Sequence, residues 1–166
     1  MTDFQRDLLF LLHDLGRLLR VDADKRARGH GMTRAQWGIL LWLERQPGLS
    51  QKELSELLEV EPISVARLVD RLEVRRMVER RPDPKDRRIW RLHLCPPAIQ
   101  ELREIHRQRA AMARRLTDGI DAATLEALTE VLITMKTTLT HDPRGATSPI
   151  PTLIDAPNMV DTREVA

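Results

Sequence analysis

Apolar side chains recur every three or four residues through the first part of the chain, which is the spacing of amphipathic helices. The first stretch ends before Gly29-His30-Gly31 and predicts one long helix. Its apolar positions are Phe4, Leu8, Leu11, Leu12, Leu15, Leu18 and Leu19. A second helix is predicted to begin at a capping box of Thr33 and Gln36 and to end at Pro47-Gly48.

Two short amphipathic helices come next, with no room for a long loop between them. Ser50 and Glu53 repeat the capping box, which predicts a helix that begins at Gln51. Pro62 suits the first turn of the following helix, because the amide hydrogen that it lacks would have no partner there. The inward side chains are predicted to be Leu54, Leu57 and Leu58 in the first helix and Ile63, Leu68, Val69 and Leu72 in the second. Two such helices around a tight turn are typical of a helix-turn-helix.

The period of the pattern changes to two at Val78–Arg81 and Ile89–Leu94, around a proline-containing loop, which predicts a β-hairpin. Pro96-Pro97 ends the strand pattern, and a long helix is predicted from there to Gly119. Asp121 is predicted to cap a last helix. The fold class is therefore mainly α with a small β-hairpin wing.

Residues 32–95 are interpreted as a winged helix-turn-helix domain, and residues 1–31 and 96–141 as a helical dimerisation region. The terminal helices carry more leucine than the core of a small winged helix can cover, so we expect a homodimer to bury the surplus. A single monomeric helical bundle is the alternative. Residues 142–166 contain four prolines and little periodicity, and are interpreted as a C-terminal tail that is disordered or packs on a partner as an arm.

The composition of the 166 residues fits one domain with an aliphatic core, because there is no tyrosine and there are only two phenylalanines and three tryptophans. No apolar run approaches the roughly 18 residues that a membrane span requires. The amino-terminal sequence also differs from a signal peptide. We therefore predict a cytoplasmic protein with no membrane partner.

Motifs of the common enzyme and metal-binding classes are missing from the sequence. There is no glycine-rich phosphate loop, GxSxG or HExxH motif, so we predict no catalysis and no cofactor. One cysteine cannot form an internal disulfide and is too few for a structural zinc site, and the five histidines are dispersed, so no metal site is predicted. That cysteine, Cys95, is interpreted as a small hydrophobe at the end of a strand rather than a redox sensor.

Basic charge is concentrated in the second helix of the helix-turn-helix and the hairpin. Residues 61–95 contain ten basic and six acidic side chains, a surplus of four, whereas the whole chain has a net charge of +2. A local excess of arginine on a small module is typical of a phosphate-binding surface. A solvated basic face with no partner is the alternative.

The outward face of the second helix carries Ser64, Arg67 and Arg71, spaced by three and four residues. In a major groove, arginine can bind guanine bidentately and serine can contact several base edges. The preceding helix would cross the backbone with Ser50 and Gln51 toward phosphate. The alternative is that Asp70 and Glu73 neutralise the two arginines.

The hairpin segment Asp83-Pro84-Lys85-Asp86-Arg87-Arg88 resembles the wing of the MarR family of bacterial transcription regulators. Leu68–Glu73 followed by Val78-Glu79-Arg80 is similar to the recognition-helix region of that family. The resemblance extends over roughly residues 4–140. Met32–Trp37 resembles the start of the second helix in the SlyA-like branch.

The resemblance implies a homodimer with interlocking first and last helices, which binds a pseudo-palindromic site in double-stranded DNA. It implies that Arg88 enters the minor groove and that Asp86 orients it, which suits the negative potential of a narrow groove. Arg87 is interpreted as a phosphate contact. The recognition-helix positions carried over are Pro62, Ser64 and Arg67.

The chain departs from the family pattern at Glu59 and Arg76, where glycine is frequent. A non-glycine residue in a left-handed conformation costs roughly 1 kcal/mol or more, so we expect these two turns to have different shapes. Cys95-Pro96-Pro97 also replaces the usual residues after the wing, which leaves the start of the next helix open.

The resemblance further implies regulation by a small aromatic acid, another carboxylate or an acyl-CoA bound between the dimer helices and the winged domain. Candidate ligand contacts are His13, Arg17, Trp37 and Trp42, with ordinary packing or a solvated charge as the alternative at each. We expect a ligand-responsive repressor. The alternative function is a winged-helix adaptor that binds an acidic protein without reading DNA sequence.

Overall fold

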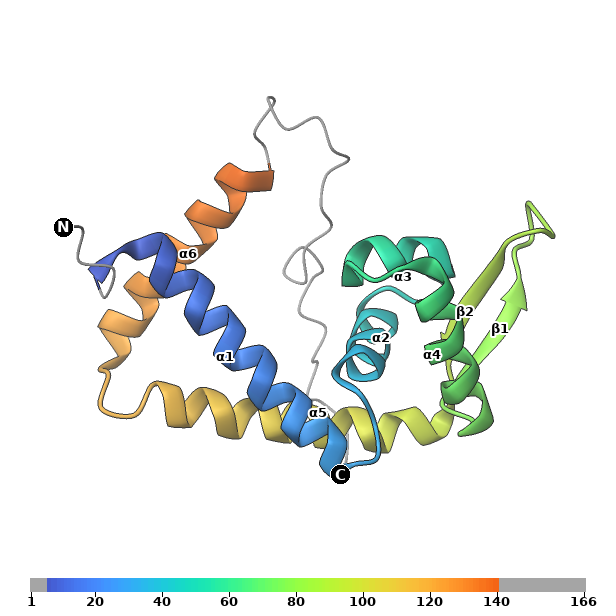
Figure 1. The fold of residues 1–166 in the computed structure, drawn as a ribbon, viewed down its shortest axis with the longest axis horizontal. Helices are drawn as coiled ribbons and strands as arrows, with labels where there is room; N and C mark the ends of the chain where they lie inside the picture. The colour runs from blue at the N-terminus through green and yellow to red at the C-terminus, as the bar shows by residue number, and fades with distance from the viewer. Residues whose placement is uncertain (1–5, 141–166) are drawn as a thin grey trace, which may run out of the picture. The chain divides into compact units, whose positions relative to one another are not determined.

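The computed structural model describes residues 6–140, which form six helices and one antiparallel hairpin (Figure 1). The elements are α1 (Leu8–Gly29), α2 (Arg34–Arg45), α3 (Gln51–Leu58), α4 (Pro62–Val74), β1 (Val78–Pro82), β2 (Trp90–Leu94), α5 (Pro96–Leu116) and α6 (Ala122–Thr140). This order confirms the predicted fold class. Phe4 and the predicted tail at residues 142–166 lie outside the described residues.

Two compact units make up the chain, and they divide between Gln108 and Arg109, inside α5. The first unit holds α1 to α4, the hairpin and the first part of α5, and it contains the buried core. The predicted division, with a winged helix-turn-helix domain at residues 32–95, has boundaries that differ from the boundary between these two units. It stays a prediction.

The local signals at the starts of α2, α3 and α4 are confirmed. The Thr33 hydroxyl accepts a hydrogen bond from the Gln36 amide (3.2 Å), and the Gln36 side chain accepts one from the Thr33 amide (2.9 Å). Ser50 and Glu53 make the same reciprocal pair at the start of α3. Pro62 is the first residue of α4.

The core of the first unit lies around α2 and is mostly aliphatic. Its largest fully buried side chains are Ile39, Leu40, Leu43, Leu54, Val65, Val69, Leu72, Val78, Leu92 and Ile105. The prediction that Ile63 belongs to the buried stripe of α4 is wrong, because its side chain is 64% exposed. Val69 and Leu72 are buried as predicted, and Val65 takes the place of Ile63 in the stripe. The spacing of four and three residues between Val65, Val69 and Leu72 turns Ile63 to the opposite face.

The hairpin is held against the segment that precedes α3. Val78 pairs with Leu94, and Arg80 with Leu92, across the two strands. The Gly48 amide donates to the Leu92 carbonyl and the Leu92 amide donates to the Leu49 carbonyl, both at 2.9 Å. The base of the wing is therefore fixed to the helix-turn-helix, while the loop between β1 and β2 extends beyond the helices (Figure 1).

Helices α1 and α6 expose many apolar side chains. On α1 they include Leu8, Leu11, Leu15 and Leu18, and on α6 they include Leu128, Val131, Leu132 and Leu139. Within residues 6–140, α6 contributes no buried residue. None of the helices described is both long and apolar enough to cross a membrane.

The turns at Glu59 and Arg76 keep the left-handed conformation, with φ of 52° and 54°. The expectation that they have different shapes is therefore wrong. In each turn the β-carbon therefore lies close to the following carbonyl oxygen, which destabilises the turn sterically. The surrounding contacts, including hydrogen bonds from Val60 to Ser55 and from Met77 to Leu72, hold the geometry in place.

Replacing Glu59 or Arg76 with glycine should stabilise the fold by about 0.5–1 kcal/mol each, because the relief of steric strain exceeds the added chain entropy. Both side chains are exposed, so little else is lost. Urea unfolding of each variant measures the change. The Glu59→Ala control should bring no gain, and a loss of stability in both glycine variants would contradict the strain.

Candidate nucleic-acid interface

The outward face of α4 presents two arginine side chains. Arg67 and Arg71 are exposed and Ser64 is half-buried, on the side of the helix away from Val65 and Val69. The structure therefore brings together the three predicted reading positions on one surface. Pro62 is also exposed, at the first position of the helix.

The carboxylates next to these arginines are engaged elsewhere. Asp70 accepts from Arg80 Nη2 at 2.6 Å, and Glu73 accepts both from Arg80 Nη1 and from the Arg80 amide. Within residues 6–140, neither Arg67 nor Arg71 has an ion pair with a carboxylate. The alternative in which Asp70 or Glu73 neutralises them is therefore wrong, since β1 supplies the competing cation.

Ser50 and Gln51 lie at the start of α3. The Ser50 hydroxyl caps the Glu53 amide, and the Nε2 atom of Gln51 is buried without a hydrogen-bond partner in the described part of the chain. Their side chains thus face the protein more than solvent. The other first-turn amides of α3, those of Gln51 and Lys52, have no partner inside the helix and can donate to phosphate.

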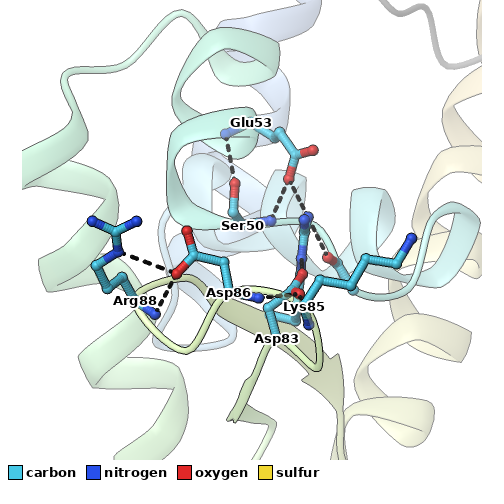
Figure 2. Close-up of polar contacts among 8 residues, drawn as sticks. Ser50, Glu53, Asp83, Lys85, Asp86 and Arg88 are labelled. Atoms are coloured by element: carbon cyan, nitrogen blue, oxygen red, sulfur yellow. Dashed lines mark hydrogen bonds and ion pairs between the residues drawn. The ribbon is translucent and has the colours of Figure 1, made fainter.

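Asp86 restrains the exposed Arg88 side chain in the wing loop. Asp86 Oδ1 accepts from the Arg88 amide at 3.0 Å and from Arg88 Nε at 3.2 Å, while the Arg88 side chain remains 91% exposed (Figure 2). Asp83 Oδ1 accepts from the amides of Lys85 and Asp86, which closes the loop (Figure 2). The neighbouring Arg87 is exposed. The loop therefore projects a restrained guanidinium beyond the hairpin.

Arg91 is a positioning residue that the sequence reasoning missed. Its Nε donates to Asp83 Oδ2 at 2.7 Å, and its Nη1 donates to Glu53 Oε2 at 2.9 Å and to the Gly48 carbonyl at 3.2 Å. One guanidinium thus ties the wing loop to the start of α3. The sequence Asp83-Pro84-Lys85-Asp86 was enough to predict the Asx turn at Asp83. The contact between Arg91 and Glu53 could not be predicted, because it depends on the register of β2.

The carboxyl groups of this network have a stabilised charge. Hydrogen bonds from Arg91 and from the Lys85 and Asp86 amides lower the pKa of Asp83 to about 2. Burial acts to raise the pKa of Glu53, but hydrogen bonds from Ser50 and the nearby Arg91 charge outweigh it and lower that pKa. Both groups are therefore ionised at neutral pH.

Acidification should weaken the attachment of the wing. The folded pKa of Asp83 lies below its ordinary value of 3.8, so its ionisation stabilises the fold above about pH 4. That contribution is lost as the pH falls toward about 2. In urea unfolding, the stability difference between wild type and Asp83→Asn should be constant above pH 5 and shrink below pH 4. A difference that does not vary with pH would contradict the assignment.

Comparison with known proteins identifies the fold family. A family model described as MarR family matches residues 30–89. The transcriptional repressor MdtR of Bacillus subtilis (strain 168) is 30% identical over 128 residues, which cover 76% of this chain and 80% of that relative. The chain belongs to the MarR family.

Two further comparisons agree with this MarR-family assignment. A putative transcriptional regulatory protein for the hcr operon of Thauera aromatica is 35% identical over 93 residues, or 54% of this chain. That match spans only 56% of the relative's own length. The solved structure of the transcriptional regulator PA3341 is 31% identical with a TM-score of 0.67, covering 78% of this chain and 95% of that one. The resemblance inferred from the wing is confirmed.

The four candidate ligand contacts of this MarR-family chain lie in two different settings. His13 and Arg17 are exposed on α1, where Arg17 pairs with Asp14. Trp37 and Trp42 belong to the buried core, and Trp37 Nε1 donates to Glu101 at 3.1 Å. These positions fit the alternative of ordinary packing or a solvated charge, and a ligand contact at any of the four stays a prediction.

A cleft of about 500 Å³ lies elsewhere in the same unit, between the start of α2 and the second half of α4. Its lining residues are Gly31, Met32, Thr33, Gln36, Asp70, Arg71, Val74 and Arg75. Arg75 donates a long hydrogen bond to the Gly31 carbonyl (3.4 Å). The cleft therefore combines two guanidinium groups with the apolar side chains of Met32 and Val74.

Cys95 is a partly buried free thiol at the end of β2 in this MarR-family chain. Burial raises the pKa of the Cys95 thiol, which disfavours the reactive thiolate. Within residues 6–140, no cluster of three histidine, cysteine or acidic side chains could hold a metal ion.

Proposed function

We propose that this MarR-family protein is a homodimeric regulator that binds specific sequences in double-stranded DNA and represses transcription by occluding promoters. The observation that carries the proposal is the pair Arg67 and Arg71, exposed on α4 while β1 neutralises the neighbouring carboxylates. Unpaired guanidiniums on one helical face are free to bind base edges and phosphates.

The wing supplies the second contact in this proposal. Arg88 is exposed and restrained by Asp86, so it can enter a narrow minor groove with little loss of side-chain entropy. Arg91 holds the wing loop to the start of α3. Arg80 of β1 likewise pairs with Asp70 and Glu73 of α4, so the reading helix and the wing are fixed to one another in the free protein. Such preorganisation favours tight and specific binding.

Homodimer formation rests on the exposed apolar faces of α1 and α6. Monomeric proteins rarely leave several neighbouring leucines uncovered, as at Leu11, Leu15 and Leu18 of α1. A two-fold dimer would cover such faces and set two reading helices about one DNA turn apart. The expected operator is therefore pseudo-palindromic.

The cleft between α2 and α4 supports regulation by a small aromatic acid. Its volume is in the range of small-molecule sites, and Arg71 and Arg75 can pair with a carboxylate. A ligand bound there would take Arg71 away from DNA. Benzoate and its hydroxylated derivatives should therefore release the wild type from its operator but act weakly on Arg75→Ala. Equal release of both proteins would contradict this site. An acyl-CoA remains the alternative effector.

Placement in the SlyA-like branch rests on Met32–Trp37, where Thr33 and Gln36 form the capping box of α2. This branch assignment is narrower than the family assignment and belongs to the proposal. A shared operator pattern with that branch would support it, and an unrelated pattern would oppose it.

Selection from a pool of random duplexes tests the proposed function. Wild type should enrich a pseudo-palindrome, and Arg88→Ala should enrich the same centre with less preference for A·T-rich flanks. Binding should also weaken steeply as salt rises. Equal, weak binding to all duplexes would favour the alternative, a winged-helix adaptor for an acidic protein.

A further inference from the structure

We infer that Ile63 reads the C5-methyl group of a thymine, as a specificity-determining residue of the proposed DNA-binding face. The inference rests on the proposed function and adds a residue that the sequence pattern had assigned to the core. Ile63 is 64% exposed in the first turn of α4, opposite the buried stripe of Val65, Val69 and Leu72.

The position of Ile63 on the helix is the first support. It stands next to Ser64 and four residues before Arg67, so Ile63 and Arg67 are neighbours on the surface of α4. Isolated exposed apolar side chains are common on proteins, so exposure by itself indicates nothing. What matters is that this side chain lies among the residues that face the groove.

The polar surroundings of Ile63 favour a contact with DNA over a contact with a protein partner. Glu61, Pro62 and Arg67 are exposed around Ile63, and Arg67 has no carboxylate partner among the described residues. A protein partner would need a wider apolar patch than one side chain. In the major groove, however, the thymine methyl is a single apolar group among donors and acceptors. One isoleucine among polar neighbours therefore matches a thymine.

The geometry also fixes where the thymine should lie. Four residues of helix separate Ile63 from Arg67 by about 6 Å along the axis. Successive base pairs are about 3.4 Å apart, so the thymine should lie within about two base pairs of the guanine bound by Arg67. The β-branched side chain has one strongly preferred rotamer in a helix, so its methyl groups are already in place.

The test uses the full-length protein and the operator obtained by selection. Each thymine is replaced singly by deoxyuridine, which removes only the C5-methyl group, and the dissociation constants of wild type and Ile63→Ala are measured. At one thymine in each half-site, the replacement should weaken wild type about fourfold, the value of one buried methyl group. Ile63→Ala should bind thymine and deoxyuridine equally there and keep the other sensitivities of wild type.

The control variant is Ile99→Ala, which truncates an exposed isoleucine in the first turn of α5, outside the helix-turn-helix and the wing. It should keep the complete deoxyuridine profile of wild type. Ile63→Ala should unfold at the same urea concentration as wild type, because alanine favours helices and the side chain packs on nothing in the described core.

Three results would overturn the inference. One is an unchanged deoxyuridine profile in Ile63→Ala, with sequence selection intact, which leaves the proposed function standing. Another is a changed oligomeric state of Ile63→Ala with that same unchanged profile, which assigns the side chain to a second copy of the chain. The third is wild type that selects no sequence, which removes the proposed function and this inference together.

Discussion

Replacing Arg67 with alanine should weaken binding to the selected operator by about 1–3 kcal/mol per half-site, or about five- to 150-fold. The guanidinium has no carboxylate partner within residues 6–140, so its removal costs DNA contacts and leaves the protein's own ion pairs intact. Base preference should relax at one position of each half-site. Fluorescence anisotropy at fixed salt, with duplexes varied at each position, measures both effects.

The matched control is Arg103→Ala, because Arg103 is an exposed arginine on α5, outside the helix-turn-helix and wing. It should change affinity by less than about twofold. A general loss of affinity in Arg67→Ala, with the base preferences unaltered, would place Arg67 on phosphate instead of a base edge. Unchanged affinity would remove Arg67 from the interface.

Replacing Leu15 with glutamate should weaken self-association at least about 100-fold. Leu15 lies on α1 between Leu11 and Leu18, and all three are close to half exposed in the single chain. In the proposed dimer this face is covered, and a buried, unpaired carboxylate costs about 3–5 kcal/mol. Sedimentation equilibrium measures the change, and operator affinity should fall with it because two linked half-sites become independent.

The control introduces the same carboxylate at an already charged position of α1, in Arg20→Glu. That variant should remain dimeric. A wild-type protein that stays monomeric at high concentration would contradict the homodimer, and a dimeric Leu15→Glu would move the interface away from this face of α1.

Signals between residues close in the chain predicted the helix starts correctly. The capping boxes at Thr33 and Ser50 and the proline at position 62 each need only three or four residues to act, so the sequence contains all of their partners. The two-residue period that predicted the hairpin also involves only residues close together in the chain. Here periodicity and capping agree with the tertiary fold.

Features that depend on tertiary packing were predicted less accurately. The apolar identity of Ile63 suggested a core residue, but the packing of α2 against α4 buries Val65 in its place, beside the correctly predicted Val69 and Leu72. The turns at Glu59 and Arg76 were expected to have different shapes because they lack glycine, yet both residues adopt the left-handed conformation. A preference of about 1 kcal/mol is easily overridden by a core of this size.

The charge network of the candidate site could be predicted only in part. Asp86 and Arg88 are two residues apart, so their contact was within reach of the sequence. The links from Arg80 to Asp70 and Glu73 and from Arg91 to Glu53 join a strand to a helix and depend on how the hairpin packs. The candidate ligand residues were chosen for chemistry alone, and the structure places them on α1 and in the core.

The most direct test of the account compares two duplexes of equal length and composition, the selected operator and a shuffled version. Fluorescence anisotropy of the full-length protein at about 0.15 M salt should show at least about 10³-fold tighter binding to the operator. Most of that preference should be lost in Arg67→Ala. Equal affinity of the wild type for both duplexes would contradict the claim that α4 and the wing read DNA sequence.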